Sequence, residues 1–197
     1  IVGGLPLVVT SHRQDPATFQ GHGLNSPAPT LSPMSLLSLV DSSLLGRAAK
    51  PALEFAGVSL NFGEIETRSN RLAHTLRARG LKAGDRLAFF LQNRIEVVDL
   101  WLAGIKLGII IVPVNVLYRE RELKHILADA EPTAVVTSHD MAGFLPAGVP
   151  RWDVDALSFD AALAATERIT VPATADTPLS LIYTSGTTGA SKGAVLT

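Results

Sequence analysis

A run of apolar residues near the middle of the chain constrains the fold most. Residues 107–114 read Leu-Gly-Ile-Ile-Ile-Val-Pro-Val and lack the polar alternation of a strand with one face in water. A strand of this kind is expected in a parallel sheet whose two faces are both covered. The run therefore predicts an α/β fold with a mainly parallel sheet.

The neighbouring segments alternate between strand and helix patterns. Asn61 stands three residues before Glu64, which is typical of a capping box, and apolar residues then recur at helical spacing as far as Gly80. Further on, the pattern predicts a strand over 86–91, a helix over 95–106, a charged helix over 119–130 and a strand over 134–137. This alternation predicts a doubly wound sheet.

The less regular segments carry weaker signals. Residues 52–60 predict a short hairpin that turns at Ala56 and Gly57, residues 138–157 predict a loop, and a short helix is expected near 157–166. Residues 1–33 are rich in Pro, Gly, Ser and Thr, which predicts a disordered leader or extension. Residues 34–197 are expected to form the globular part.

Composition excludes several classes of function. The formal net charge of −1 gives no basic surface for nucleic acid, and the absence of cysteine excludes disulfides, zinc–thiolate sites and a cysteine nucleophile. A reducing, cytoplasmic location is compatible with this composition. The longest apolar region, residues 98–117, is interrupted by Asp99, Lys106, Pro113 and Asn115, so no transmembrane segment is expected.

Scattered polar residues do not form a recognisable site. His74, His125 and His139 have no metal-ligand spacing, and we interpret them as structural or solvated. Asp153 and Asp155 are expected to be solvated loop charges.

The segment after residue 178 has the composition of a phosphate-binding loop. An apolar, strand-like stretch leads into small, hydroxylated and glycine-rich residues that a lysine closes. The Walker motif fails, because Ser191 stands where its second glycine would be, and Thr184 likewise breaks the dinucleotide pattern Gly-x-Gly-x-x-Gly. A flexible loop with a solvated lysine is the simplest alternative.

The order Tyr-Thr-Ser-Gly-Thr-Thr-Gly-Ala-Ser-Lys-Gly over residues 183–193 closely resembles the phosphate-loop signature of the adenylate-forming superfamily. This superfamily contains acyl-CoA synthetases, nonribosomal peptide adenylation domains and luciferases. Ser191 departs from the pattern, which most often has Pro there. Residues 60–65, 80–88 and 103–115 also resemble motifs of this family, so the resemblance extends from about residue 43 to residue 197.

The resemblance implies a fold and an activity. The chain would be part of the large N-terminal domain of an adenylate-forming enzyme, ending just after the phosphate loop. In this family a carboxylate attacks the α-phosphate of ATP, pyrophosphate leaves, and a thiol, usually that of coenzyme A, then displaces AMP. Mg²⁺ assists, and Thr184 matches a position whose hydroxyl lies near the metal in some relatives. The implied ATP-binding residues are Thr184, Ser185, Gly186, Thr187, Thr188, Gly189 and Lys192.

Other necessary parts of such an enzyme would lie after residue 197. These include the adenine-binding motif, the ribose-binding Asp, most of the acyl pocket and the catalytic Lys, so no catalytic residue is expected in this chain and we expect it to be inactive alone. A carboxylate–CoA ligase is the leading hypothesis. An adenylation domain that loads a carrier protein and a non-catalytic remnant remain as alternatives, and the acid is not identified.

Overall fold

The computed structural model describes residue 38, residues 42–184 and residues 191–197, all within one compact unit, Ser32–Thr197. Residue 38 and residues 42–44 are helical, and an antiparallel hairpin of β1 (Pro51–Phe55) and β2 (Val58–Asn61) follows. Ala56 and Gly57 form the turn with φ of 50° and 81°, a left-handed pair suited to a two-residue hairpin. The predicted hairpin is therefore confirmed.

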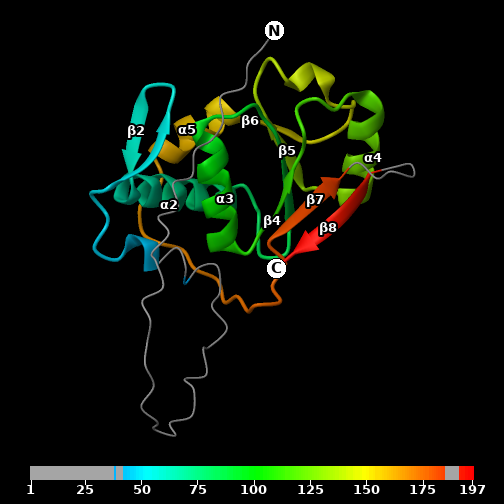
Figure 1. The fold of residues 1–197 in the computed structure, drawn as a ribbon. Coiled ribbons are helices and arrows are strands. Elements are labelled where there is room, and N and C mark those ends of the chain that lie inside the picture. Colours follow the sequence, from blue (N-terminus) through cyan, green and yellow to red (C-terminus); the bar gives the residue numbers. More distant parts are fainter. Residues whose placement is uncertain (1–37, 39–41, 185–190) are drawn as a thin grey trace, which may run out of the picture. The chain divides into compact units, whose positions relative to one another are not determined.

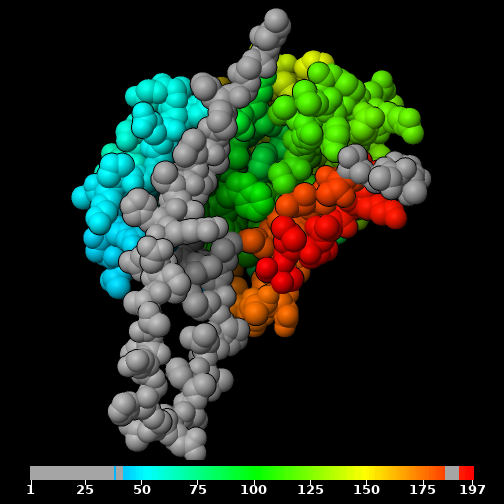
Figure 2. All heavy atoms as spheres, in the orientation of Figure 1, coloured from blue at the N-terminus to red at the C-terminus, as the bar shows by residue number. Residues whose placement is uncertain are grey.

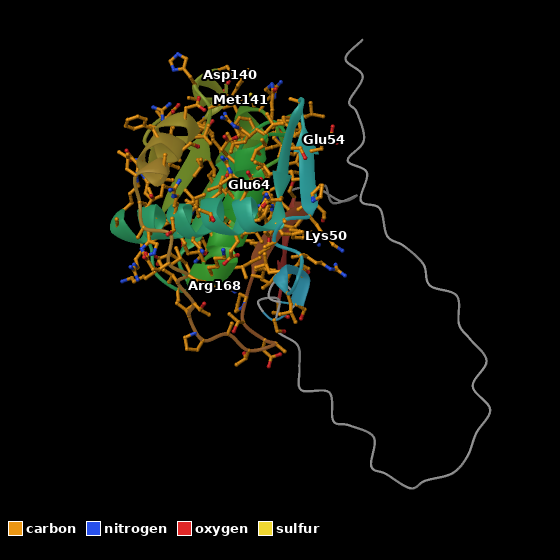
Figure 3. The ribbon with its side chains drawn as sticks, turned by 90° about the vertical axis from the view of Figure 1, so that its left-hand side faces the viewer. Lys50, Glu54, Glu64, Asp140, Met141 and Arg168 are labelled. Carbon is orange, nitrogen blue, oxygen red and sulfur yellow. The ribbon has the colours of Figure 1, made fainter. Side chains whose placement is uncertain are left out.

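Helix α2 (Phe62–Ala78) starts at the predicted capping box. The Asn61 side chain accepts a hydrogen bond from the Glu64 amide at 2.8 Å, and the Glu64 carboxylate accepts one from the Asn61 amide, also at 2.8 Å. Figure 3 shows Glu64 at this end of α2, beside the hairpin. These reciprocal bonds satisfy amides that a helix start leaves without partners.

A six-stranded sheet forms the centre of the described unit (Figure 1). Its strand order is β6 (Arg151–Asp153), β5 (Ala134–Thr137), β3 (Arg86–Phe90), β4 (Ile110–Pro113), β7 (Ser180–Thr184) and β8 (Lys192–Leu196). Every neighbouring pair is parallel except β7 and β8, which are antiparallel. The mainly parallel α/β sheet predicted from sequence is thus confirmed.

Helices cover both faces of this sheet. Helices α2, α3 (Ile95–Leu107) and α5 (Val154–Ala162) contribute to one buried cluster, whereas α4 (Glu120–Ala130) contributes to another. Ile111 belongs to the first cluster and its neighbour Val112 to the second, and both are fully buried. The missing polar alternation of this strand therefore has the expected cause.

The apolar run itself divides between two elements. Leu107 is the last residue of α3, and Gly108 caps the helix in the left-handed region with φ of 67°. A Cβ at Gly108 would also lie 2.9 Å from Val171 Cγ2, so both conformation and space favour glycine. Trp101 of α3 is half-buried and meets Phe89 edge-on, with ring centroids 6.2 Å apart.

After β5, the loop predicted over 138–157 is wrong, whereas the short helix expected near 157–166 is present with shifted bounds, as α5. The segment 138–157 contains a short 3₁₀ helix (Ala142–Phe144), strand β6 and the start of α5, so it is not only a loop. The helix expected near 157–166 begins earlier because the Asp153 carboxylate caps it, accepting from the amides of Asp155 and Ala156 at 3.0 and 2.9 Å. Asp155 pairs with Arg94 at 2.5 Å. Neither carboxylate is therefore a simple solvated charge.

A long segment after α5 returns to α2 before β7 begins. The carbonyl oxygens of Thr166 and Glu167 contact Asn70 Nδ2 and His74 Nε2, each at 2.9 Å. Arg168 lies 3.7 Å from Glu66, and it can be seen near α2 in Figure 3. No helix in the described part of the chain is both long enough and apolar enough to cross a membrane.

Candidate functional site

The carboxyl ends of the parallel strands meet at one edge of the sheet. Strands β3, β4, β5 and β7 end at Phe90, Pro113, Thr137 and Thr184, and they run in the same direction. Ligands of open α/β sheets bind at this edge. The segment predicted to bind phosphate follows the end of β7 and therefore starts at this edge.

Strand β8 brings the predicted lysine back to this edge. Because β8 is antiparallel to β7, its first residue, Lys192, is the cross-strand partner of Thr184, the last residue of β7. Figure 1 shows the two strands (orange and red) side by side. Two predicted site residues that are eight positions apart in sequence are thus direct neighbours in space.

Both side chains are available to a ligand. Thr184 and Lys192 are exposed, and within the described ranges neither side chain has a hydrogen-bond or ion-pair partner. All five residues of β8 are exposed, and the strand lies on the open surface in Figure 2. An unpaired ammonium beside a hydroxyl suits the charge and hydrogen-bonding capacity of a phosphate group.

The other predicted site residues cannot be placed. Ser185, Gly186, Thr187, Thr188 and Gly189 lie outside the described residues. Their assignment as phosphate-binding residues remains a prediction from the resemblance.

The described residues could hold a magnesium ion only if the substrate phosphates supplied most of its ligands. Among them, no group of three or more His, Cys, Asp or Glu side chains is arranged to hold a metal. Mg²⁺ usually keeps several waters and reaches nucleotide sites on substrate phosphates with one or two protein ligands. The exposed Thr184 hydroxyl is compatible with that limited role.

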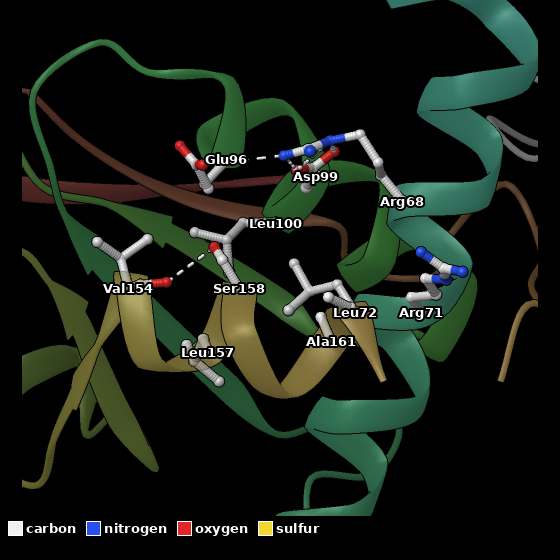
Figure 4. A pocket seen from close by; sticks show the side chains of 11 residues that line it. Arg68, Arg71, Leu72, Glu96, Asp99, Leu100, Val154, Leu157, Ser158 and Ala161 are labelled. Carbon is white, nitrogen blue, oxygen red and sulfur yellow. Dashed lines mark hydrogen bonds and ion pairs between the residues drawn. The ribbon is translucent and has the colours of Figure 1, made fainter. Parts of the chain in front are cut away.

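A separate pocket lies on the face of the sheet that α2, α3 and α5 cover (Figure 4). Its volume is about 130 Å³, below the roughly 300–1,000 Å³ of typical ligand pockets. Its rim charges are largely paired: Arg68 binds Asp99 through two nitrogens, at 3.0 and 2.6 Å, and lies 3.8 Å from Glu96.

The charged groups at the rim of this pocket contact one another and hold α2 and α3 together. Burial raises the pKa of Asp99 despite the opposing effect of Arg68. Arg71 Nε is buried without a partner within the described residues, and a cavity of this size has room for a water molecule to satisfy it. This small, charge-paired pocket is therefore the weaker candidate for a ligand site, and the assignment of phosphate binding to the strand ends stays a prediction.

Comparisons with known proteins identify the family of this chain. The family described as AMP-binding enzyme matches residues 41–197. The chain belongs to the AMP-binding enzyme family. Its mainly parallel sheet is that of the N-terminal domains of adenylate-forming enzymes.

The relatives of this chain differ in the acceptor that their names give, an acyl-carrier protein or CoA. It is 34% identical to a fatty acid–[acyl-carrier-protein] ligase ScoC of Streptomyces coeruleorubidus, over 74% of this chain and 30% of the relative. It is 31% identical to a 3-oxocholest-4-en-26-oate–CoA ligase of Rhodococcus rhodochrous, over 81% of this chain and 32% of the relative. The chain thus spans about a third of the length of these relatives.

Solved structures give the same fold. The N-terminal domain of FACL13 from Mycobacterium tuberculosis superposes with a TM-score of 0.74 and 27% identity, over 80% of this chain and 42% of that one. The NpsA N-terminal subdomain of Klebsiella oxytoca, in complex with 3-hydroxybenzoyl-AMSN, has a TM-score of 0.76 over 87% of this chain and 43% of that one. At 23% identity, the second likeness bears on the fold alone.

Sequence reasoning missed two features of this site. It assigned no strand to residues 192–196, because a short edge strand of Lys-Gly-Ala-Val-Leu shows no clear alternation. It also gave His125 no role near the predicted phosphate-binding segment, although His125 Nε2 lies 2.8 Å from the Ser191 carbonyl oxygen, just before β8. The sequence separation of 66 residues left no local signal for that contact.

Proposed function

We propose that the full-length protein containing this chain is an ATP-dependent carboxylate–CoA ligase. The pairing of Thr184 with Lys192 at the carboxyl edge of the sheet is the observation that carries the proposal. Membership of the AMP-binding enzyme family and the CoA ligase among the relatives support it.

The proposed reaction has two steps. A carboxylate oxygen attacks the α-phosphorus of ATP, the bond to the bridging oxygen breaks, and pyrophosphate leaves with that electron pair. The thiol sulfur of coenzyme A then attacks the acyl carbon, AMP leaves, and the thiol proton passes to solvent. Charge develops on the departing phosphate oxygens in both steps, so fixed positive charge and hydrogen-bond donors are the catalytic aids needed.

The residues of this chain would act on the pyrophosphate side. The Lys192 ammonium is a compact point charge that balances the charge of the β- and γ-phosphates. The Thr184 hydroxyl contributes a hydrogen bond or a ligand to Mg²⁺, which when bound would neutralise phosphate charge. Within the described residues, neither Thr184 nor Lys192 would have to break a side-chain hydrogen bond or ion pair to bind the phosphates.

Exchange of labelled pyrophosphate into ATP tests the first step. The full-length protein should show exchange that depends on a carboxylic acid, screened over fatty, aromatic and steroid acids. Lys192→Ala should lower exchange by about 10²-fold, the scale of losing one group that stabilises transition-state charge. Lys124→Ala is a matched control, because that lysine lies on α4 and pairs with Glu120 on the surface.

Two results would contradict the proposal. Absence of acid-dependent exchange across the panel removes the activity, and full exchange by Lys192→Ala removes Lys192 from the site. Loading of a carrier protein is a second candidate, favoured by the acyl-carrier-protein ligase among the relatives. Supplying either coenzyme A or a phosphopantetheinylated carrier, and measuring which thioester forms, separates the two acceptors.

A further inference from the structure

Helix α4 contacts one residue on each side of the segment 185–190, Tyr183 in β7 and Ser191 just before β8. Tyr183, near the end of β7, donates its hydroxyl hydrogen to Asp129 Oδ2 at 2.5 Å. Ser191, just before β8, accepts at its carbonyl oxygen from His125 Nε2 at 2.8 Å. The two strand contacts therefore bracket the pair formed by Thr184 and Lys192.

The two helix residues lie on one face of α4. His125 and Asp129 are four positions apart, so they are neighbours on the helix surface, separated by about 6 Å along its axis. Figure 1 shows α4 next to the ends of β7 and β8. This face of α4 therefore makes one hydrogen bond to β7, through Asp129, and one to the residue before β8, through His125.

The helix is itself firmly held on the sheet. Leu123, Ile126 and Leu127 are buried in the same cluster as Tyr183, which is only 7% exposed. Burial and the Asp129 carboxylate raise the pKa of Tyr183 well above its ordinary value. The phenol therefore remains a protonated donor throughout the physiological range.

The contact of His125 also has a defined donor. A carbonyl oxygen only accepts, so its position assigns the hydrogen to Nε2 of the imidazole ring. The His125 ring is therefore the donor in the bond to Ser191.

From these contacts we infer that His125 and Asp129 are positioning residues for the nucleotide site. They hold the paired ends of β7 and β8 against α4 and so fix where Thr184 and Lys192 lie at the edge of the sheet, and they touch no substrate themselves. The inference rests on the proposed function.

The test measures ATP–pyrophosphate exchange by the full-length protein, with ATP and the carboxylic acid varied in turn. His125→Ala and Asp129→Ala should each raise the KM for ATP about fivefold, the effect of one lost hydrogen bond. The KM for the acid should change by less than twofold. His125→Gln keeps a donor and Asp129→Asn keeps an acceptor, so both should retain the KM for ATP within twofold. Lys124→Ala on the same helix serves as the control.

Several outcomes would overturn the inference. These are an unchanged KM for ATP in both alanine variants, equal loss in the alanine and the conservative variants, and a parallel rise in both KM values with a lowered melting temperature. The last result would mean that α4 only stabilises the fold. Absence of exchange in the unsubstituted protein would instead overturn the proposed function, and this inference with it.

Discussion

Replacing Lys106 with Met tests how much a buried charged cluster contributes to the stability of this fold. Lys106 is 1% exposed, and its ammonium contacts Glu66 Oε2 at 2.8 Å, Ser69 Oγ at 2.6 Å and Asn70 Oδ1 at 2.7 Å. The cluster joins α3 to α2. Methionine retains much of the apolar stem but removes the donor to these three side chains and to the Glu66 carbonyl oxygen, which lies 3.4 Å from Lys106 Nζ.

The expected loss of stability depends on which partners the acceptor groups keep after Lys106 is replaced. Glu66 is 19% exposed in its side chain and also lies near Arg168, so part of its charge stays compensated. Ser69 and Asn70 are buried, and their acceptor atoms would lose this donor. Breaking a buried ion pair on one side costs about 3–5 kcal/mol. Since domains have about 5–15 kcal/mol of stability, Lys106→Met should remain folded but clearly weakened.

Urea unfolding of the chain, followed by circular dichroism, measures this free energy of unfolding. The slope of the free energy of unfolding against urea concentration should stay unchanged, so that only the midpoint of unfolding moves. Lys124→Met is the surface control and should cost less than about 1 kcal/mol, because its pair with Glu120 is exposed.

A double variant sharpens the test of the cluster. Lys106→Met combined with Glu66→Gln should be less destabilising than the sum of the single changes, because the uncompensated carboxylate is then gone. A loss below about 1 kcal/mol for Lys106→Met, or strict additivity in the double variant, would refute the reasoning.

Three further changes have defined outcomes. Asn61→Ala removes the cap of α2 and should lower the free energy of unfolding by about 1 kcal/mol, whereas Asn61→Ser should restore most of it. Gly104→Ala places a Cβ 2.7 Å from the buried Ile111 Cδ1 and should cost about 1–3 kcal/mol; Gly143→Ala, in open space, is the control for urea unfolding. Burial raises the pKa of Asp99 from 3.8, so its contribution to stability is full below that value and is lost as pH rises through the raised pKa. Asp99→Asn should therefore gain stability relative to the parent as pH rises above about 4, and a difference that is constant or falls over pH 3–7 would contradict this.

Local signals were sufficient for the elements with strong patterns. The capping box, the hairpin turn and the apolar strand depend on residues close together in sequence, so their physical causes could be read directly. Strand β6 and strand β8 escaped prediction because both are short, lie at the edges of the sheet and are mostly exposed. Without a buried face, a strand leaves little periodic trace.

By itself, the sequence determined the α/β class and the identity of the phosphate-loop signature, since both follow from residue order within short windows. Only the tertiary structure decided that Lys192 lies opposite Thr184, because that neighbour relation comes from antiparallel pairing of β8. The same holds for the contact of His125 with Ser191 across 66 positions. Hydrogen bonds of this kind depend on where the sheet and its covering helix bring distant residues together, and no local pattern encodes them.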